Sequence, residues 1–228
     1  MLAILDYQAG NDQPVAVRTG VGSINRVFNL PIELSGVTMT INGAACGLKR
    51  VGRRQIEFVV PIGLASTVTG TTYPLVINNN GIVMKNTVTI VPARPDIFAK
   101  DGFMGPGGRA KLFNVTNTVF TTEPFAVRTI LRHGNRLVPS VLRIYVTGVA
   151  NVPVALLSVR FRDLLNREVN ISAKTAPTMI EPGVYTFDFE LTPALQGVGD
   201  QPIVVNVLIG TATFSSRLED TAPRVAIL

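Results

Sequence analysis

Asp188 and Glu190 are the two acidic residues whose spacing comes closest to paired acid chemistry. They alternate along an expected strand, so both carboxylates point to the same face about 7 Å apart, a separation at which acid–base pairs can work. Phe187, Phe189 and Leu191 alternate with them. Because apolar residues facing a core and polar residues facing solvent explain this pattern fully, the sequence predicts the solvent face of a strand here and no catalytic pair.

The densest group of basic residues is Lys49, Arg50, Arg53 and Arg54. The chain has a formal net charge of +6 at pH 7, but its basic residues are spread along the sequence, and aromatic residues make up only 7% of it. Nucleic-acid binders concentrate Lys and Arg on one face, with aromatic side chains between them. The cluster is therefore predicted to be a solvated turn, with a polyanion contact as the alternative interpretation.

Residues that could supply a nucleophile, a metal site or a phosphate site are few. His133 is the only histidine and Cys46 the only cysteine, so no disulfide can form within the chain and His-based catalysis lacks a partner. Asp96 and Asp101 flank an expected connector, but calcium needs about six oxygen ligands and no Asp-x-Asp motif supplies them. The glycine-rich segment 105–109 is not followed by the residues of a phosphate loop. We expect no catalytic residue, no metal site and no cofactor, and therefore no enzyme.

Apolar residues recur at every second position over most of the chain, the pattern of half-buried strands. Runs of this kind include 37–41, 55–60, 156–162 and 185–191. Twenty glycines and 15 prolines punctuate the chain, with turn pairs such as Asn42-Gly43 and Asn80-Gly81 between the strands. Helical windows allow one turn each, at 61–65 and 193–196. The sequence predicts an all-β sandwich or barrel and, without an apolar run of about 18 residues, no membrane insertion.

The sequence also repeats itself in a fixed order. Segment 14–19 recurs as 124–129, 56–58 resembles 187–189, and 74–78 resembles 202–206. The offset within each pair changes along the chain, as it does when two copies of one topology differ in loop length. Pro92 and Pro95 bracket a stiff, extended connector between the copies. We therefore expect one immunoglobulin-sized domain at 1–95 and a second at 96–228.

Several strand and turn motifs resemble one known group of proteins. In the first half they are 30–43 (LPIELSGVTMTING), 54–61 (RQIEFVVP), 79–83 (NNGIV), 86–90 (NTVTI) and 95–98 (PDIF). In the second half they are 141–149 (VLRIYVTGV), 182–189 (PGVYTFDF), 195–205 (LQGVGDQPIVV) and 213–217 (TFSSR). The chain is similar in these motifs to the C-terminal region of uncharacterised bacterial secreted or cell-surface proteins, which consists of tandem immunoglobulin-like domains of the IPT/TIG kind. The resemblance implies two such β-sandwiches and carries over no catalytic residue.

The N-terminal segment departs from the family pattern. Residues 142–149 look like the opening strand of an IPT/TIG domain, whereas residues 20–29 fit the same role poorly in the first half. The first strands of domain one are therefore expected to be atypical or truncated, which exposes a sheet edge. We expect residues 3–17 to fill this edge, with Pro14 limiting them to an edge position. A strand from a neighbouring molecule or from upstream sequence is the alternative.

The predicted function is a non-catalytic structural or adhesive module that binds protein or surface glycan through loops or a sheet edge. Residues 1–6 lack the features of a leader, so the chain is either cytoplasmic or a part of an exported protein whose leader lies upstream. The resemblance implies the second, with an extracellular or cell-surface location. One alternative is a nucleic-acid-binding immunoglobulin-like protein, the less favoured choice because neither half has a concentrated basic field. The other is a carbohydrate-binding accessory module, disfavoured by the absence of Trp. Strand-mediated self-association is also expected.

Overall fold

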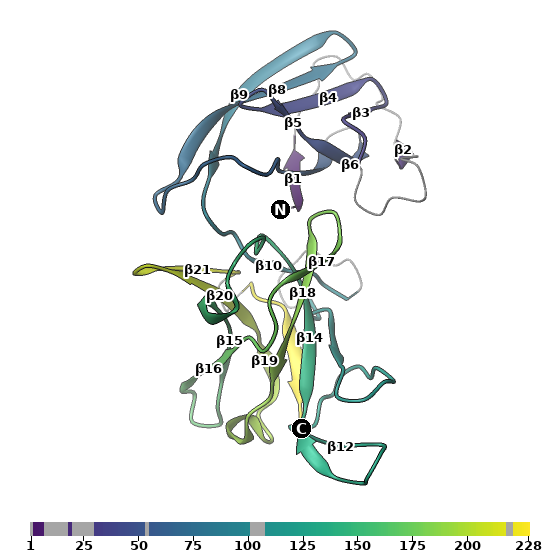
Figure 1. The fold of residues 1–228 in the computed structure, drawn as a ribbon, viewed down its shortest axis with the longest axis vertical. Coiled ribbons are helices and arrows are strands. Elements are labelled where there is room, and N and C mark those ends of the chain that lie inside the picture. Colours follow the sequence, from purple (N-terminus) through teal and green to yellow (C-terminus); the bar gives the residue numbers. More distant parts are fainter. Residues whose placement is uncertain (1, 7–17, 20–29, 53–54, 101–107, 218–220) are drawn as a thin grey trace. The chain divides into compact units, whose positions relative to one another are not determined.

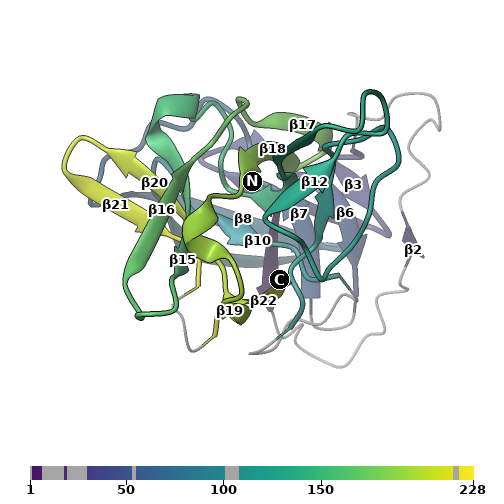
Figure 2. The same cartoon turned by 90° about the horizontal axis from the view of Figure 1, so that it is seen from below.

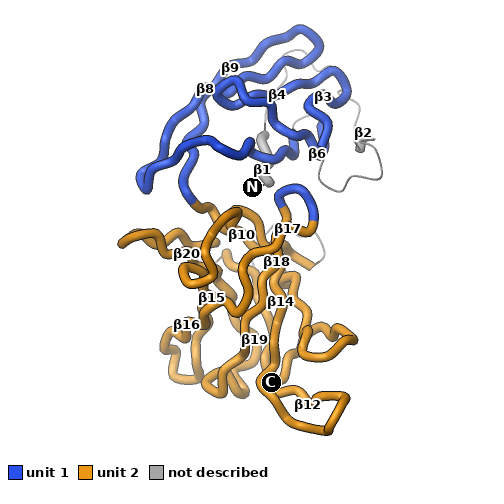
Figure 3. Tube along the Cα trace, in the orientation of Figure 1, with its two compact units in different colours: residues 1–92, 181–183 blue, residues 93–180, 184–228 orange. Residues whose placement is uncertain are grey.

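The computed structural model describes all residues except 1, 7–17, 20–29, 53–54, 101–107 and 218–220, and for 2–6 and 18–19 it describes the backbone alone. The chain divides into two compact units (Figure 3). Unit 1 comprises Met1–Pro92 with Glu181–Gly183, and unit 2 comprises Ala93–Ile180 and Val184–Leu228. A separate cluster of buried apolar side chains forms the core of each unit.

Unit 1 contains two antiparallel sheets (Figure 1). The first has the strand order β1-β7-β6-β2, and the second has the order β3-β4-β8-β9, with β5 paired to β4. The strands are β1 Leu2–Asp6, β2 Arg18–Thr19, β3 Glu33–Leu34, β4 Val37–Ile41, β5 Ala44–Ala45, β6 Gly47–Val51, β7 Gln55–Val59, β8 Thr71–Asn79 and β9 Ile82–Ile90.

The core of unit 1 receives side chains from both sheets. Val37, Met39 and Ile41 alternate along β4 and are at most 1% exposed, and Ile56 and Phe58 contribute from β7. The period-two pattern of the sequence therefore places one face of each strand in the core. Each large apolar side chain buried in this way stabilises the fold by about 1.5–3 kcal/mol.

Unit 2 has a similar sandwich-like construction. One sheet has the order β10-β14-β18-β17, with β11 also paired to β14, and another has the order β16-β15-β20-β21, whose strands lie side by side in Figure 2. Two further pairs are β12-β13 and β19-β22. The strands are β10 Asp96–Ile97, β11 Leu112–Asn114, β12 Arg128–Ile130, β13 Leu137–Pro139, β14 Val141–Thr147, β15 Leu157–Arg162, β16 Glu168–Ser172, β17 Thr178–Glu181, β18 Val184–Glu190, β19 Gly199–Pro202, β20 Val204–Ile209, β21 Ala212–Ser215 and β22 Arg224–Ile227.

The core of unit 2 also joins its two larger sheets. Phe187 and Phe189 of β18 and Phe161 of β15 are at most 1% exposed and belong to one cluster. The rings of Phe161 and Phe189 lie 6.0 Å apart, within the range of favourable aromatic contacts. Aromatic side chains from facing sheets therefore fill the centre of unit 2.

The all-β class predicted from the sequence is confirmed. Among the described residues, helical structure is limited to two 3-10 turns, η1 Val154–Leu156 and η2 Pro193–Leu195. The second falls in the predicted window 193–196, whereas the window 61–65 forms a turn without a helix. At Asn80-Gly81 both residues have positive φ, 51° and 92°, as a two-residue hairpin with the right-handed strand twist requires.

The two units share one arrangement of strands. The order β1-β7-β6 in unit 1 corresponds to β14-β18-β17 in unit 2, and β5-β4-β8-β9 corresponds to β16-β15-β20-β21. Corresponding strands also follow each other in the same order along the chain. The two units therefore repeat one topology over these seven strands.

Two of the repeated segments fall on corresponding strands. Segments 56–58 and 187–189 lie on β7 and β18, and segments 74–78 and 202–206 lie on or next to β8 and β20. Of the segment 14–19, residues 14–17 lie outside the described residues. For the remaining two, the predicted match to 124–129 is wrong, because Arg18–Thr19 pairs with β6 whereas Arg128–Ile130 pairs with β13. The two segments match because both are rich in β-forming residues, and not because they occupy corresponding places in the two units.

The N-terminal strand lies within unit 1. β1 pairs antiparallel with β7, from Leu2 opposite Val59 to Asp6 opposite Gln55. The chain itself therefore supplies the neighbour of β7, as expected for the start of segment 3–17. Its remaining residues, Pro14 among them, and the segment 20–29 lie outside the described residues.

Candidate functional site

The predicted basic cluster begins on β6, where a β-bulge interrupts the pairing with β7. Lys49 is the extra residue of this bulge, and Arg50 lies opposite Glu57. The Arg50 Nη1 atom is 3.5 Å from Glu57 Oε1. Arg53 and Arg54 lie outside the described residues. Lys49 Nζ likewise lies 3.5 Å from Glu181 Oε2. Both described cations of this cluster thus lie beside a carboxylate that offsets their charge.

The predicted pair of carboxylates has a different environment from the one expected. Phe187 and Phe189 face the core as predicted, but Asp188 is only 8% exposed. Arg143 lies directly opposite Asp188 on the neighbouring β14. Its Nε and Nη2 donate to the two carboxylate oxygens at 2.7 and 2.9 Å. The solvent-face prediction for Asp188 is therefore wrong, because a cross-strand arginine and the sheet around it shield the carboxylate.

Glu190 forms its own ion pair on the same strand. Lys174 Nζ donates to Glu190 Oε2 at 2.6 Å, and both side chains are substantially exposed, at 52% and 42%. Asp188 and Glu190 are thus each bound to a separate cation. Two carboxylates held in this way act as parts of ion pairs and not as a proton-sharing pair.

Three aromatic residues and two cations form a surface over β11 and β14, which we call the aromatic surface. The Phe113 ring lies 5.7 Å from the Tyr145 ring and 6.5 Å from the Phe120 ring. Lys111 Nζ lies 4.4 Å from the centre of the Tyr145 ring, and the Arg143 guanidinium lies 5.8 Å from that of Phe120. Both distances suit cation–π attraction. With Phe120 50% exposed, the surface offers an aromatic face to solvent.

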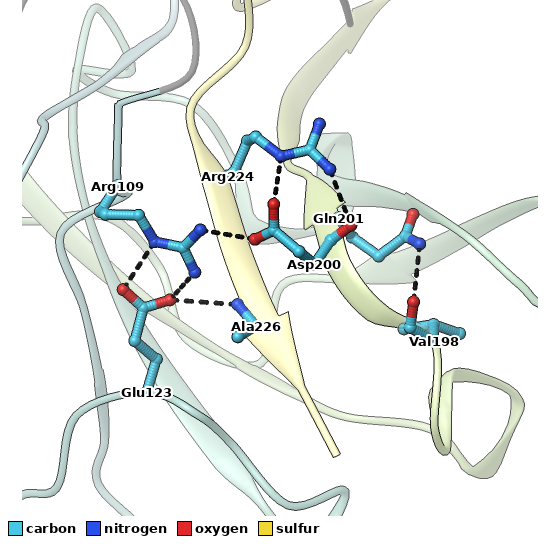
Figure 4. A network of polar contacts seen from close by, with 7 residues as sticks. All are labelled: Arg109, Glu123, Val198, Asp200, Gln201, Arg224 and Ala226. Carbon is cyan, nitrogen blue, oxygen red and sulfur yellow. Dashed lines mark hydrogen bonds and ion pairs between the residues drawn. The ribbon is translucent and has the colours of Figure 1, made fainter.

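Figure 4 shows an ion-pair network at the C-terminal strand of unit 2. Arg109 donates to both oxygens of Glu123, through Nε at 2.9 Å and through Nη2. Its Nη1 donates to Asp200 Oδ1, and Arg224 donates to Asp200 Oδ2 through Nε and to the Asp200 backbone oxygen through Nη2 at 2.8 Å. Glu123 also accepts the backbone N–H of Ala226 at 3.0 Å.

The backbone brings these side chains together. Arg109 and Arg224 form a parallel bridge, and Asp200 lies opposite Ala226 in the pairing of β19 with β22. The hydrogen bonds from Arg109 lower the pKa of Glu123 against the opposing effect of burial. Burial likewise opposes the ionisation of Asp200, but the hydrogen bonds from Arg224 and Arg109 outweigh it and lower its pKa. Both carboxyl groups are therefore held in the ionised form.

Two cations and two anions compensate each other within this network. The network holds β22 in place and has a structural role, because each of its charged groups already has partners of opposite sign. Sequence reasoning missed it, since Glu123 and Asp200 are 14 and 91 positions from Arg109. Arg109 drew attention only as the end of the glycine-rich segment 105–109, of which residues 105–107 lie outside the described residues.

Cys46 and His133, the residues that could have supplied a nucleophile and a base, lie in different units of the chain. Cys46 is fully buried in the core of unit 1. Burial raises the pKa of its thiol to about 12, which suppresses the reactive thiolate. His133 is exposed in the turn between β12 and β13. Both positions agree with the structural roles predicted for these residues.

The described residues of the connector show no group of ligands for a cation. Asp96 Oδ1 accepts the N–H of Ile97 at 2.9 Å, and Arg217 Nε lies 3.4 Å from the same carboxylate oxygen. Asp101 lies outside the described residues. Across the part of the chain that the structure describes, no three His, Cys, Asp or Glu side chains gather where they could hold a metal ion. In that same part, no helix has the length and apolar character needed to cross a membrane.

Comparisons with known proteins find weak structural likeness and no match of sequence family. No protein-family model and no curated protein matches the chain. Among solved structures, the chain is similar to an endo-fucoidan hydrolase from glycoside hydrolase family 107, with 9% sequence identity and a TM-score of 0.15. The match covers 83% of this chain and 38% of the hydrolase chain. A TM-score this low carries no argument about fold or function.

Proposed function

We propose that this chain is a non-catalytic structural or adhesive module of the cell exterior. In this proposal two tandem immunoglobulin-like domains bind protein or surface glycan through sheet edges and hairpin loops. The resemblance of the strand and turn motifs to the IPT/TIG regions of bacterial surface proteins supports both the domain type and the location.

The order of the strands supports the immunoglobulin-like assignment. A constant-type immunoglobulin sandwich has strands A, B, E and D in one sheet and C, F and G in the other. Unit 2 fits this order with β10, β14, β18 and β17 as A, B, E and D, and with β15, β20 and β21 as C, F and G. Unit 1 fits it from strand B onward, with β1, β7 and β6 as B, E and D.

The observation that carries the binding role is the loop between β15 and β16. Its residues Leu164 and Leu165 are each 71% exposed. Asp163 fixes the loop, because its Oδ1 accepts the N–H groups of Leu165 and Arg167, both at 2.9 Å. A hydrogen-bonded turn that holds two adjacent leucines in solvent is typical of a contact surface carried by a rigid scaffold.

The aromatic surface supports glycan as one class of partner. Aromatic rings stack on the apolar faces of sugars, and the cations Lys111 and Arg143 at its rim can donate hydrogen bonds to hydroxyl or acidic groups. The proposal thus has a loop suited to protein and a surface suited to sugar, both in unit 2.

Binding is tested with beads that carry the full chain at a defined density. These beads are mixed with beads that carry purified surface polysaccharides, a purified surface protein or further copies of the chain. We expect clustering with at least one partner, reduced about tenfold by the double variant Leu164→Asp/Leu165→Asp where the loop makes the contact. Leu228→Asp, which changes another exposed leucine, is the matched control and should leave clustering unchanged.

Nucleic acid is tested in parallel with a labelled DNA duplex at physiological salt. We expect only weak, salt-sensitive binding. Sub-micromolar affinity that is lost in Lys49→Ala/Arg50→Ala, together with no clustering of beads, would contradict the proposal and favour the nucleic-acid alternative.

A further inference from the structure

Strand β9 forms an edge of the second sheet of unit 1. It has nine residues, and within the described part of the chain it pairs only with β8. The corresponding strand of unit 2, β21, has only four residues. Ile82 and Val83 of β9 are 47% and 52% exposed, and Lys85 is its one charged residue. A long edge with so little charge presents backbone N–H and C=O groups to another strand. The N–H of Thr87 donates to the neighbouring Asn86 Oδ1 at 2.8 Å and would exchange this contact for one to the partner strand.

The residues of β9 are complementary to a second, antiparallel copy of β9. In the register centred on Asn86, Ile82 lies opposite Ile90, Val83 opposite Thr89, Met84 opposite Val88, and Lys85 opposite Thr87. All nine residues of each strand are paired in this register. No charged side chain lies directly opposite a like charge, and such an opposition would destabilise a cross-strand pair.

Neighbouring registers are less favourable. Moving the centre to Lys85 places the two lysines directly opposite each other. Moving it to Thr87 places the apolar Val88 opposite the polar Asn86 and leaves Ile82 without a partner. A shift that changes the pairing parity would set core-facing residues against solvent-facing ones.

The packing of β9 also fits this register. Met84 and Val88 are partly buried and pack against the core of unit 1, so they lie on the core-facing side of the strand. With a second copy in place, Met84 of each chain meets Val88 of the other. The edges of two hydrophobic cores then cover one another, which removes further apolar surface from water.

We propose that two copies of this chain associate through β9, antiparallel about a two-fold axis at Asn86, and join their second sheets into one continuous sheet. The inference rests on the proposed function, because it names a second copy of the chain as the partner of that module's sheet edge. An interface of this kind is isologous and closes as a dimer.

A single cysteine at the axis tests the register. In Asn86→Cys the two new thiols lie opposite each other, at the Cα separation of about 4.5–5.5 Å that antiparallel pairs share with disulfides. We expect oxidised glutathione to convert the full chain into a covalent dimer. Val83→Cys is the matched control on the same strand, because its two copies lie about 20 Å apart along the strands. The native Cys46 is buried and does not compete.

Charge changes at Thr87 test the same register without a covalent bond. Thr87→Glu sets a carboxylate opposite Lys85 of the other copy and should tighten the dimer about threefold to tenfold, whereas Thr87→Lys should weaken it as much. Thr118→Glu and Thr118→Lys make the same changes at an exposed threonine of unit 2 and should have no effect. Sedimentation equilibrium of the full chain measures each dissociation constant.

The outcomes separate this inference from the proposed function. A dimer that follows the charge at position 87 and cross-links through position 86 supports the inference. A monomer at every concentration, an assembly larger than a dimer, or cross-linking that is equal at positions 83 and 86 overturns it. Clustering of chain-bearing beads with polysaccharide or protein beads would leave the proposed function intact in each of these cases, whereas tight DNA binding would overturn the function alone.

Discussion

At the scale of single residues, the surroundings of a carboxylate decide what it contributes. Asp188 and Glu190 are alternate residues of one strand, and each binds one cation. Asp188 is 8% exposed and its partner is a bidentate arginine, whereas the Glu190 pair lies in solvent. Water screens the charges of the Glu190 pair and can replace their contact readily. The two ion pairs therefore differ in strength, although both carboxylates occupy alternate positions of one strand.

Neutralising these two carboxylates should therefore have unequal costs. Asp188→Asn leaves the Arg143 charge partly shielded from water without an ionised partner, and we expect a loss of about 2 kcal/mol in the free energy of unfolding. Glu190→Gln should cost at most about 1 kcal/mol. Urea denaturation at pH 7 measures both values. Equal losses would show that burial of Asp188 adds nothing to its ion pair.

The network around Arg109 predicts a dependence of stability on pH. The pKa values of Glu123 and Asp200 are lowered in the folded state, chiefly by hydrogen bonds from arginine. Below the unfolded values of about 4, the unfolded chain therefore binds more protons than the folded chain. The stability due to the network is present above that pH and is lost as the pH falls through the folded pKa values.

Glu123→Gln isolates this contribution. We expect the variant to be less stable than the wild type at pH 7 and the difference to shrink as the pH is lowered toward 2.5. Urea midpoints measured at intervals over this range give the comparison. A difference that stays constant with pH would mean that the ionisation of Glu123 does not stabilise the fold.

At the scale of elements, one close approach fixes the start of unit 2. Gly148 has a φ of 73°, and a Cβ atom at this position would lie 1.7 Å from the backbone oxygen of Arg94. The N–H of Arg94 in turn donates to the Gly148 oxygen at 3.1 Å. The segment that follows Pro92 thus packs against the end of β14 at a distance that only glycine permits.

Two glycines with the same φ allow the stability cost of this close contact to be measured apart from the cost of backbone strain. Gly197 also has a φ of 73°, but its Cβ would meet no atom within 4 Å. Gly197→Ala should cost about 1 kcal/mol, for the left-handed conformation alone. Gly148→Ala should cost at least about 2 kcal/mol more, because backbone must also move. Thermal unfolding compares the two, and equal losses would contradict the close contact.

The elements were more predictable from the sequence than the polar contacts. Strands such as β4 can be predicted because Val37, Met39 and Ile41 alternate with threonines. This local pattern determines which face of the strand is buried. Asn80-Gly81 likewise specifies its turn through the φ values that these residues tolerate. The match between 14–19 and 124–129 predicted corresponding strands wrongly, because β-forming composition does not determine which strands become neighbours.

The Arg109 network and the burial of Asp188 could not be predicted in the same way. Arg109 and Asp200 are 91 positions apart, and their contact depends on how β19 pairs with β22. Asp188 is covered because the register of β14 and β18 sets Arg143 beside it. Neither register follows from a local pattern, so the partner of each charge emerges only from the folded topology.

At the scale of the whole molecule, two separate cores predict two unfolding events. Met39→Ala in unit 1 and Phe187→Ala in unit 2 each remove a side chain that is 1% exposed, at a cost of about 2–5 kcal/mol. We expect calorimetry of the full chain to show two transitions, each lowered by only one of the variants. A single transition that both variants lower equally would show that the two cores unfold as one.

In the function proposed above, exposed edges and loops of this chain bind its partners, and its ion pairs stabilise the fold. Bead clustering and thermal melting of the same variants test it directly. We predict that Thr87→Lys reduces clustering between beads that both carry the chain. Leu164→Asp/Leu165→Asp should reduce clustering where the loop between β15 and β16 makes the contact. The melting temperature of each variant should stay within about 2 °C of the wild type. Glu123→Gln should instead lower the melting temperature and leave clustering unchanged below it. The reverse pattern, with clustering lost in the ion-pair variant and retained in the surface variants, would contradict this proposal.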